Sequence, residues 1–179
     1  MRRLLGGMLA ALLLAWSVPG HAFVADSARD EVPGSLNLMA LNMYQEAGGE
    51  GDEGMLAVGW VVLNRVADPS YPKTIEGVIS QGCQFSWRCD GRSDAPRSEQ
   101  RWRRALDLAR TMLEAPPPDP TGGAISFHNT FVSPDWHGLR RTVQIGNHVF
   151  YARPDGRARS RDDGFQYQIR YVSLLTAQR

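Results

Sequence analysis

The chain has 179 residues, of which 42% are hydrophobic and 22% are charged, a composition typical of one globular domain with a single core. Its formal net charge is +1, and removing residues 1–22 deletes two of the 20 basic residues and none of the 19 acidic ones, which leaves −1. This balance excludes a general polyanion binder and gives no indication of nucleic-acid binding.

The N-terminus has the three-part pattern of a secretory signal peptide. Two arginines precede an apolar run from Leu4 to Trp16, and small residues follow at a cleavage-like spacing. The run is short for a membrane span, and an uncleaved signal anchor is the alternative. We therefore expect a signal peptide at 1–22, a periplasmic or secreted chain from Phe23 without stable membrane insertion, and a flexible lead-in at 23–35.

Helices are predicted where apolar residues recur every three to four positions behind a capping residue. The predicted segments, in chain order, are a helix from Leu36 to the Gly48-Gly49 stop with Ser35 as its cap, Asp52 to Val66, a short helix after Thr74 through Ile79, and a long helix starting at 93–96. The second helix has one apolar face on which Gly59 permits the close approach of a neighbour. The long helix carries its arginines off the apolar stripe, which is typical of a packed helix with a solvated face.

The pattern changes after the proline-rich connector at 116–120. β-Branched and aromatic residues then cluster at 124–128, 143–145 and 148–152, with Gly146-Asn147 as a hairpin turn. Helices followed by strands, with no internal repeat, predict an α+β fold. Residues 154–179 are expected to form a partly ordered C-terminal extension, in which QYQIRYVSLL is either a final strand or a docking segment.

Cys83 and Cys89 are the only two cysteines of the chain. In an exported chain, which meets oxidising conditions, an even count at short spacing favours a disulfide. A zinc site has less support because no further cysteine exists. The short loop should add stability at or below the low end of about 2–4 kcal/mol, and it should hold the residues from Gln84 to Trp87 in shape.

The stretch MYQEAGGEGDEG at 43–54 holds four carboxylates and no basic residue. It does not fit the spacing of an EF-hand calcium loop, and helices flank it too closely for a linker. Glu46 falls in the last turn of the first helix, where the helix dipole and the carboxylates of Glu50, Asp52 and Glu53 disfavour its ionisation. If apolar walls also exclude water, Glu46 stays protonated near neutral pH and can act as a general acid. On spacing alone, a surface glutamate that ends the helix is the favoured interpretation.

The histidines suggest an alternative to Glu46 as the catalytic group, namely a zinc site. His128, His137 and His148, together with Glu46 or Asp135, could ligate zinc and cleave an amide bond. No HExxH or other fixed ligand spacing supports this hypothesis. A serine or cysteine nucleophile has less support still, because no GxSxG motif occurs and both cysteines are expected to be paired.

Five segments stand in a recognisable order: QEAGGEGDEGMLAVGWVVLNRV, YPKTIEGVIS, CQFSW, AISFHNTFVSPDW and IGNHVFYAR. Through them, residues 36–153 resemble the catalytic domain of the cell-wall hydrolase family typified by the spore-cortex-lytic enzyme SleB. The resemblance implies a mainly helical, lysozyme-like α+β fold with a small antiparallel sheet. It also implies cleavage of peptidoglycan glycan strands to a 1,6-anhydro end, with no cofactor or metal and with the first glutamate of EAxGE, here Glu46, as the general acid and base.

The sequence departs from the family at two positions beside that glutamate. Gln45 and Gly48 stand where members commonly carry glycine and arginine. Without that arginine, Glu46 is expected to have less positive charge nearby to stabilise its ionised form. For glycan binding we expect side chains with amide, imidazole or aromatic groups, which suit N-acetyl groups and sugar rings. These are Asn64, Gln84, Phe85, His128, Trp136, His148 and Tyr151.

Two of the expected binding residues have structural alternatives. Asn64 could instead tie down a loop, Phe85 could belong to the core, and Glu50 is expected to support Glu46 indirectly. We expect a monomer whose partner is the peptidoglycan glycan strand, without nucleic acid. A metal-dependent peptidoglycan amidase and a non-catalytic wall-binding protein are the alternative functions.

Overall fold

The structure is a computed structural model that describes residues 34–155. Contacts divide the chain into two units, residues 1–31 and 32–179, and the described residues lie within the second. The predicted signal peptide, most of the lead-in and the extension beyond residue 155 therefore lie outside the described residues. In the part of the chain that is described, no helix is long and apolar enough to cross a membrane.

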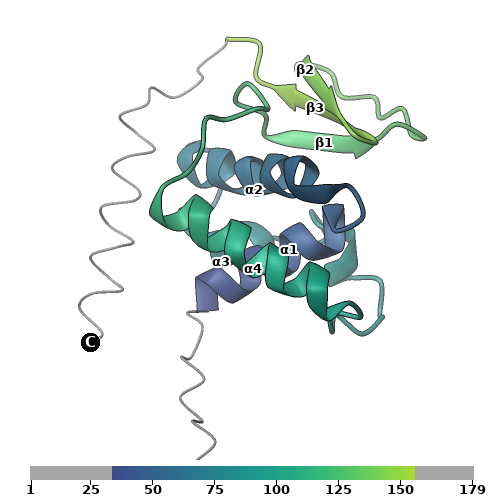
Figure 1. Ribbon diagram of the computed structural model, residues 1–179. Helices are drawn as coiled ribbons and strands as arrows, with labels where there is room; N and C mark the ends of the chain where they lie inside the picture. The colour runs from purple at the N-terminus through teal and green to yellow at the C-terminus, as the bar shows by residue number, and fades with distance from the viewer. Residues whose placement is uncertain (1–33, 156–179) are drawn as a thin grey trace, which may run out of the picture. The chain divides into compact units, whose positions relative to one another are not determined.

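Residues 34–155 form a group of helices and a small antiparallel sheet, as Figure 1 shows. In chain order the elements are α1 (Gly34–Ala47), α2 (Gly51–Ala67), α3 (Ile75–Ile79), the 3-10 helix η1 (Ser86–Arg88), α4 (Glu99–Glu114), β1 (Ser126–Asn129), β2 (Arg140–Ile145) and β3 (His148–Ala152). The sheet has the strand order β1-β3-β2. This arrangement confirms the predicted mainly helical α+β fold with a small antiparallel sheet.

Helix α1 begins at Gly34, two residues before the predicted start. The prediction that Ser35 caps this helix is wrong, because Ser35 lies within the helix, and its hydroxyl donates a hydrogen bond to the carboxylate of Glu76 on α3. The helix ends at Ala47, as predicted, and the Gly48 amide donates to the Tyr44 carbonyl (3.0 Å) just beyond it. Glu46 therefore lies in the last turn.

Helix α2 lies between the other helices and the sheet (Figure 1). Its predicted apolar face packs in one core with α1, α3 and α4, while Ala57 and Val61 pack with Phe150 in a second core under the sheet. A Cβ atom at Gly59 would lie 2.3 Å from Met112 Sδ of α4, which confirms the predicted close approach. The central helix is thus buried on two sides, and the sequence pattern indicated only one of them.

Helix α3 has the predicted cap, since Thr74 Oγ1 accepts a hydrogen bond from the Gly77 amide (3.0 Å). Helix α4 starts at Glu99 behind Ser98, later than the predicted 93–96. The residues before it are held against α1 instead. The amides of Arg97 and Ser98 both donate to the Tyr44 hydroxyl (2.9 and 3.1 Å), which keeps this segment out of the helix.

The hairpin of β2 and β3 turns at Gly146-Asn147, as predicted, and Gly146 adopts φ +55°, a conformation that favours glycine. Strand β1 pairs with β3 so that Phe127 lies opposite Phe150. Because strand side chains alternate, Phe127, His148 and Phe150 share the face toward α2, and His128 shares the opposite face with residue 151.

Cys83 and Cys89 form the predicted disulfide, with their Cα atoms 5.7 Å apart. The loop that they close places two aromatic side chains, Phe85 and Trp87, in the core. Trp87 Nε1 also donates to Asn42 Oδ1 of α1 (3.0 Å). The disulfide thus closes a loop that is packed against α1, the helix that carries Glu46.

Replacing both cysteines by serine should lower the free energy of unfolding by about 2 kcal/mol, because the unfolded chain regains the freedom of a short loop. Urea unfolding of the wild type and the Cys83→Ser/Cys89→Ser variant would measure the difference. Wild type unfolded with a reducing agent is the control, and it should match the variant. Equal urea midpoints for the oxidised wild type and the variant would contradict the prediction.

Candidate active site

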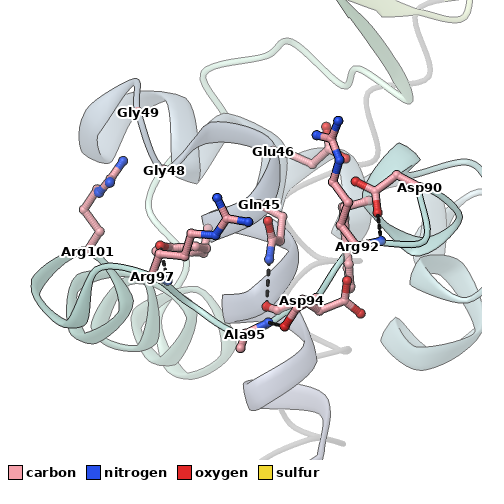
Figure 2. Close-up of a pocket in the computed structure, with 13 residues that line it drawn as sticks. Gln45, Glu46, Gly48, Gly49, Asp90, Arg92, Asp94, Ala95, Arg97 and Arg101 are labelled. Atoms are coloured by element: carbon pink, nitrogen blue, oxygen red, sulfur yellow. Dashed lines mark hydrogen bonds between the residues drawn. The ribbon is translucent and has the colours of Figure 1, made fainter.

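Glu46 lines a pocket of about 330 Å³ at the end of α1 (Figure 2). The rest of the lining comes from neighbouring residues of α1, from the loop that follows η1, and from Arg101 near the start of α4. Gln45 Nε2 donates to the Asp94 carbonyl (2.8 Å) and so attaches this loop to α1. The glutamate is therefore placed by a helix end and framed by a loop that packs on the same helix.

Burial raises the pKa of Glu46 to about 7, while Arg65 and a hydrogen bond from the Ser86 backbone lower it. Its Oε1 atom is buried and has no hydrogen-bond partner. The carboxyl is thus close to half protonated near neutral pH, and one of its oxygens is unpaired. These are the properties required of a general acid that also serves as a base.

The expected cause of this raised pKa is corrected by the structure. Desolvation is the largest cause, and the neighbouring carboxylates do not contribute. Asp52 pairs with Arg104 on α4, and Glu50 accepts a hydrogen bond from His148 on β3. Two of the three acidic residues that follow Glu46, Glu50 and Asp52, thus contact other elements.

Arg65 supplies the positive charge that Gly48 does not. Its side chain is buried, its Nε donates to the Ile125 carbonyl (2.7 Å), and its guanidinium lies 5.2 Å from the centre of the Phe85 ring. Its Nη1 has no hydrogen-bond partner, and burial lowers its pKa. Sequence reasoning missed this residue, although a charge within the apolar stripe of α2 was a signal.

Glu50 and His148 form a buried pair that joins the start of α2 to β3. Glu50 Oε2 lies 3.0 Å from His148 Nδ1, and both side chains are largely buried. The carboxylate fits a space left by two glycines: added Cβ atoms would lie 2.7 Å from Glu50 Cβ at Gly54 and 2.6 Å from its Oε2 at Gly146. Glu50 thus fixes the segment after Glu46 to the sheet, which is consistent with its expected indirect role.

Three of the expected glycan-binding residues form one aromatic cluster. The His128 ring lies 5.6 Å from Trp136 and 5.3 Å from Tyr151, and the Trp136 and Tyr151 rings are 5.4 Å apart. His128 Nε2 also contacts the Tyr151 hydroxyl at 3.1 Å. None of the three lines the pocket that contains Glu46, and the cluster lies on the sheet face opposite α2.

The other expected binding residues also lie outside that pocket. Asn64 donates to Asp119 Oδ2 and to the Ala124 carbonyl (both 3.0 Å), so it ties down the loop before β1, the structural role considered for it. Phe85 is only 1% exposed and packs in the core against Phe127. Gln84 is exposed on the disulfide loop.

The histidines are dispersed rather than clustered. His148 contacts Glu50, His137 contacts Asp135, and His128 contacts Tyr151. Within residues 34–155 no group of three or more histidine, cysteine, aspartate or glutamate side chains is arranged to hold a metal ion. The described geometry therefore offers no ligand set for the amidase hypothesis.

Comparison with protein families gives a match to cell wall hydrolases over residues 49–151. The chain belongs to this family. The matched segment includes Glu50, Arg65 and the disulfide loop, and it begins just after Glu46.

Two curated cell wall hydrolase relatives are spore cortex-lytic enzymes. This chain is 30% identical over 141 residues to that of Bacillus subtilis, which covers 75% of this chain and 44% of the relative. It is 36% identical over 119 residues to that of Oceanobacillus iheyensis, covering 64% and 40%. The chain thus spans less than half the length of these relatives.

Two solved structures share the fold. The catalytic domain of the Bacillus cereus SleB protein is 30% identical with a TM-score of 0.53, and the match covers 70% of this chain and 99% of that one. The catalytic domain of the germination-specific lytic transglycosylase SleB from Bacillus anthracis is 31% identical with a TM-score of 0.53, covering 66% and 93%. The predicted lysozyme-like fold is thereby confirmed.

Proposed function

We propose that this cell wall hydrolase cleaves the glycan strands of peptidoglycan, with Glu46 as general acid and then general base. The observation that carries the proposal is the buried carboxyl of Glu46, whose pKa is raised to about 7 and whose Oε1 is unpaired beside an open pocket. The name of one structural relative, a germination-specific lytic transglycosylase, supports the same reaction class.

In the proposed reaction, protonated Glu46 donates its proton to the glycosidic oxygen between N-acetylmuramic acid and N-acetylglucosamine. The bond from C1 of muramic acid to that oxygen breaks, and N-acetylglucosamine leaves with the proton. The Glu46 carboxylate then removes the proton of the muramic acid 6-hydroxyl, whose oxygen attacks C1 to form the 1,6-anhydro end. Glu46 is again protonated, and one carboxyl suffices because the nucleophile belongs to the substrate.

The aromatic cluster of His128, Trp136 and Tyr151 is the proposed surface for sugar rings away from the reacting bond. Trp136 is 38% exposed, which leaves an apolar ring surface open to solvent. Flat aromatic faces bind the apolar faces of sugar rings, and the His128 imidazole can hydrogen bond to hydroxyl groups. Phe85 and His148 are buried in the structure, and their proposed contribution is to hold the site in place.

We also propose that the protein acts outside the cytoplasm, as a monomer, and that residues 1–22 direct its export. The proposed substrate lies in the cell wall, and the Cys83–Cys89 disulfide is of a kind that persists in oxidising compartments. Mass spectrometry of the N-terminus of the protein recovered from the extracytoplasmic fraction tests cleavage after residue 22. An intact N-terminus in that fraction would instead support a signal anchor.

Digestion of purified sacculi, with mass spectrometry of the released muropeptides, tests the proposed reaction. Fragments that end in 1,6-anhydro-N-acetylmuramic acid are expected. Reducing ends would show hydrolysis rather than transglycosylation, and peptides released from intact strands would show an amidase. Binding to sacculi without any soluble product would support a wall-binding protein and would overturn the proposal.

Replacing Arg65 by methionine should shift the pKa of Glu46 to higher pH, because the positive charge that lowers it is removed. Since the protonated form starts the reaction, the alkaline limb of the pH profile of kcat/KM should move to higher pH. Arg65→Lys keeps the charge and is the matched control, with a limb close to that of the wild type. A limb that stays in place or moves to lower pH in Arg65→Met would contradict the role given to Arg65.

A further inference from the structure

Three arginines line the pocket beside Glu46: Arg92, Arg97 and Arg101. In Figure 2 the guanidinium groups of Arg92 and Arg97 extend to the same side of the loop as the Glu46 carboxyl. Two carboxylates, Asp90 and Asp94, also belong to the lining. With Glu46 neutral, the ionised side chains of the lining sum to one net positive charge.

These arginines differ from most others in the described chain by having no side-chain partner. Residues 34–155 contain 11 arginines, and seven of them have a guanidinium contact: Arg65 with Ile125, Arg88 with Trp87, Arg103 with Glu99, Arg104 with Asp52, Arg110 with Asp107, Arg141 with Gln144, and Arg153 with Asp68. Three of the remaining four line the pocket. The fourth, Arg140, lies on β2.

The carboxylates of the same loop do not neutralise them. Asp90 Oδ1 accepts a hydrogen bond from the Arg92 amide (2.9 Å), so it stabilises the turn rather than binding a guanidinium. The Arg97 amide is bonded to the Tyr44 hydroxyl, and the Arg101 amide to Ser98 Oγ, which fixes the two backbones and leaves the guanidinium groups free. The pocket thus presents three guanidinium groups that have no side-chain partner among the described residues.

We propose that this pocket binds the carboxylates of the peptide attached to N-acetylmuramic acid, an inference that rests on the proposed function. Arginine binds carboxylates through paired, charge-assisted hydrogen bonds. The stem peptide is carried by the same sugar whose glycosidic bond is broken, so it must lie close to the general acid. Glu46 and the three arginines share one pocket, whose volume is in the range of small-ligand sites.

The expected effect is a preference for strands that carry stem peptides. Exposed charge pairs are individually weak, so three arginines together should favour peptide-bearing strands by roughly threefold or more. The contacts are the same before and during bond cleavage, so the preference should appear in KM rather than in kcat. It should also fall as salt is raised, because exposed charges are screened.

Two substrates test the proposal: glycan strands with intact stem peptides, and the same strands after an amidase has removed the peptides. The quantity measured is the ratio of kcat/KM for the first to that for the second. The wild type should show a ratio of about three or more. In the Arg92→Gln/Arg97→Gln/Arg101→Gln variant this ratio should fall toward one, mainly through a higher KM for peptide-bearing strands.

Arg140→Gln is the matched control, because Arg140 is exposed, unpaired among the described residues and outside the pocket; its ratio should equal that of the wild type. Thermal unfolding verifies that the triple variant folds. A wild-type ratio of one, or a triple variant that keeps the wild-type ratio, would overturn this inference alone. Cleavage of neither substrate by the wild type would overturn the proposed function and this inference with it.

Discussion

Glu46→Gln is expected to lower the kcat of strand cleavage by at least about 100-fold, since proton transfer by a positioned side chain contributes about 10²–10⁴-fold. Glutamine keeps the size and shape of the side chain but can neither donate the proton to the leaving oxygen nor accept one from the 6-hydroxyl. The measurement is the rate of muropeptide release from sacculi below pH 7, where Glu46 is largely protonated. Equal release by the two proteins would show that Glu46 is not the general acid.

The same variant is expected to gain stability relative to the wild type as pH rises. Burial raises the pKa of Glu46 from 4.5 to about 7, so the folded state holds this proton more tightly than the unfolded state. The corresponding stabilisation is fully present below about pH 4.5 and is lost as pH rises through about 7, a change of up to about 3 kcal/mol. Glutamine has no such dependence.

Urea unfolding at about pH 4 and pH 8 would measure this change, with the stability of the variant relative to the wild type increasing at the higher pH. The result also serves as the folding control for the activity measurement. An inactive variant that is folded and relatively more stable at pH 8 has lost chemistry, whereas an inactive variant that is unfolded would say nothing about the role of Glu46. A constant difference in stability between the two pH values would contradict the buried position of the carboxyl.

Local features of the fold were predictable from the sequence because their causes are local. The stop of α1 after Ala47, the cap at Thr74 and the turn at Gly146-Asn147 each depend on residues a few positions apart. The start of α4 was predicted too early, because Arg97 and Ser98 are held by the hydroxyl of Tyr44, more than 50 positions away.

The position of Glu46 in the fold was predictable, and the surroundings of its carboxyl were not. The position of Glu46 follows from the end of its helix, but the cause of its raised pKa is burial, which no local pattern measures. Arg65 reaches the site from another helix, and its backbone partner, Ile125, is 60 positions away. Arg92 and Arg97 lie on a loop whose backbone is held against α1, and Arg101 lies in α4, so their common place beside Glu46 could not be predicted from spacing.

Glu50→Ala is expected to lower the free energy of unfolding by about 1–3 kcal/mol, because removing one partner of a buried hydrogen bond leaves the other partner unsatisfied. Glu50 Oε2 and His148 Nδ1 are 3.0 Å apart, and the pair joins segments 98 positions apart. Urea unfolding would measure the loss. Glu53→Ala, an exposed acid in the first turn of the same helix, is the matched control and should cost less than about 1 kcal/mol.

A double-mutant cycle with His148→Ala separates this pair from the other contacts of each residue. If the hydrogen bond carries the effect, the two substitutions should be less than additive by about 1 kcal/mol or more, and additive losses would show that Glu50 acts through other contacts.

The activity of Glu50→Ala is also expected to fall. Glu50 lies four residues after Glu46 and fixes the intervening turn to β3, so Glu50→Ala should also lower kcat while the chain is still folded. Unchanged kcat in the folded variant would limit the role of Glu50 to stability.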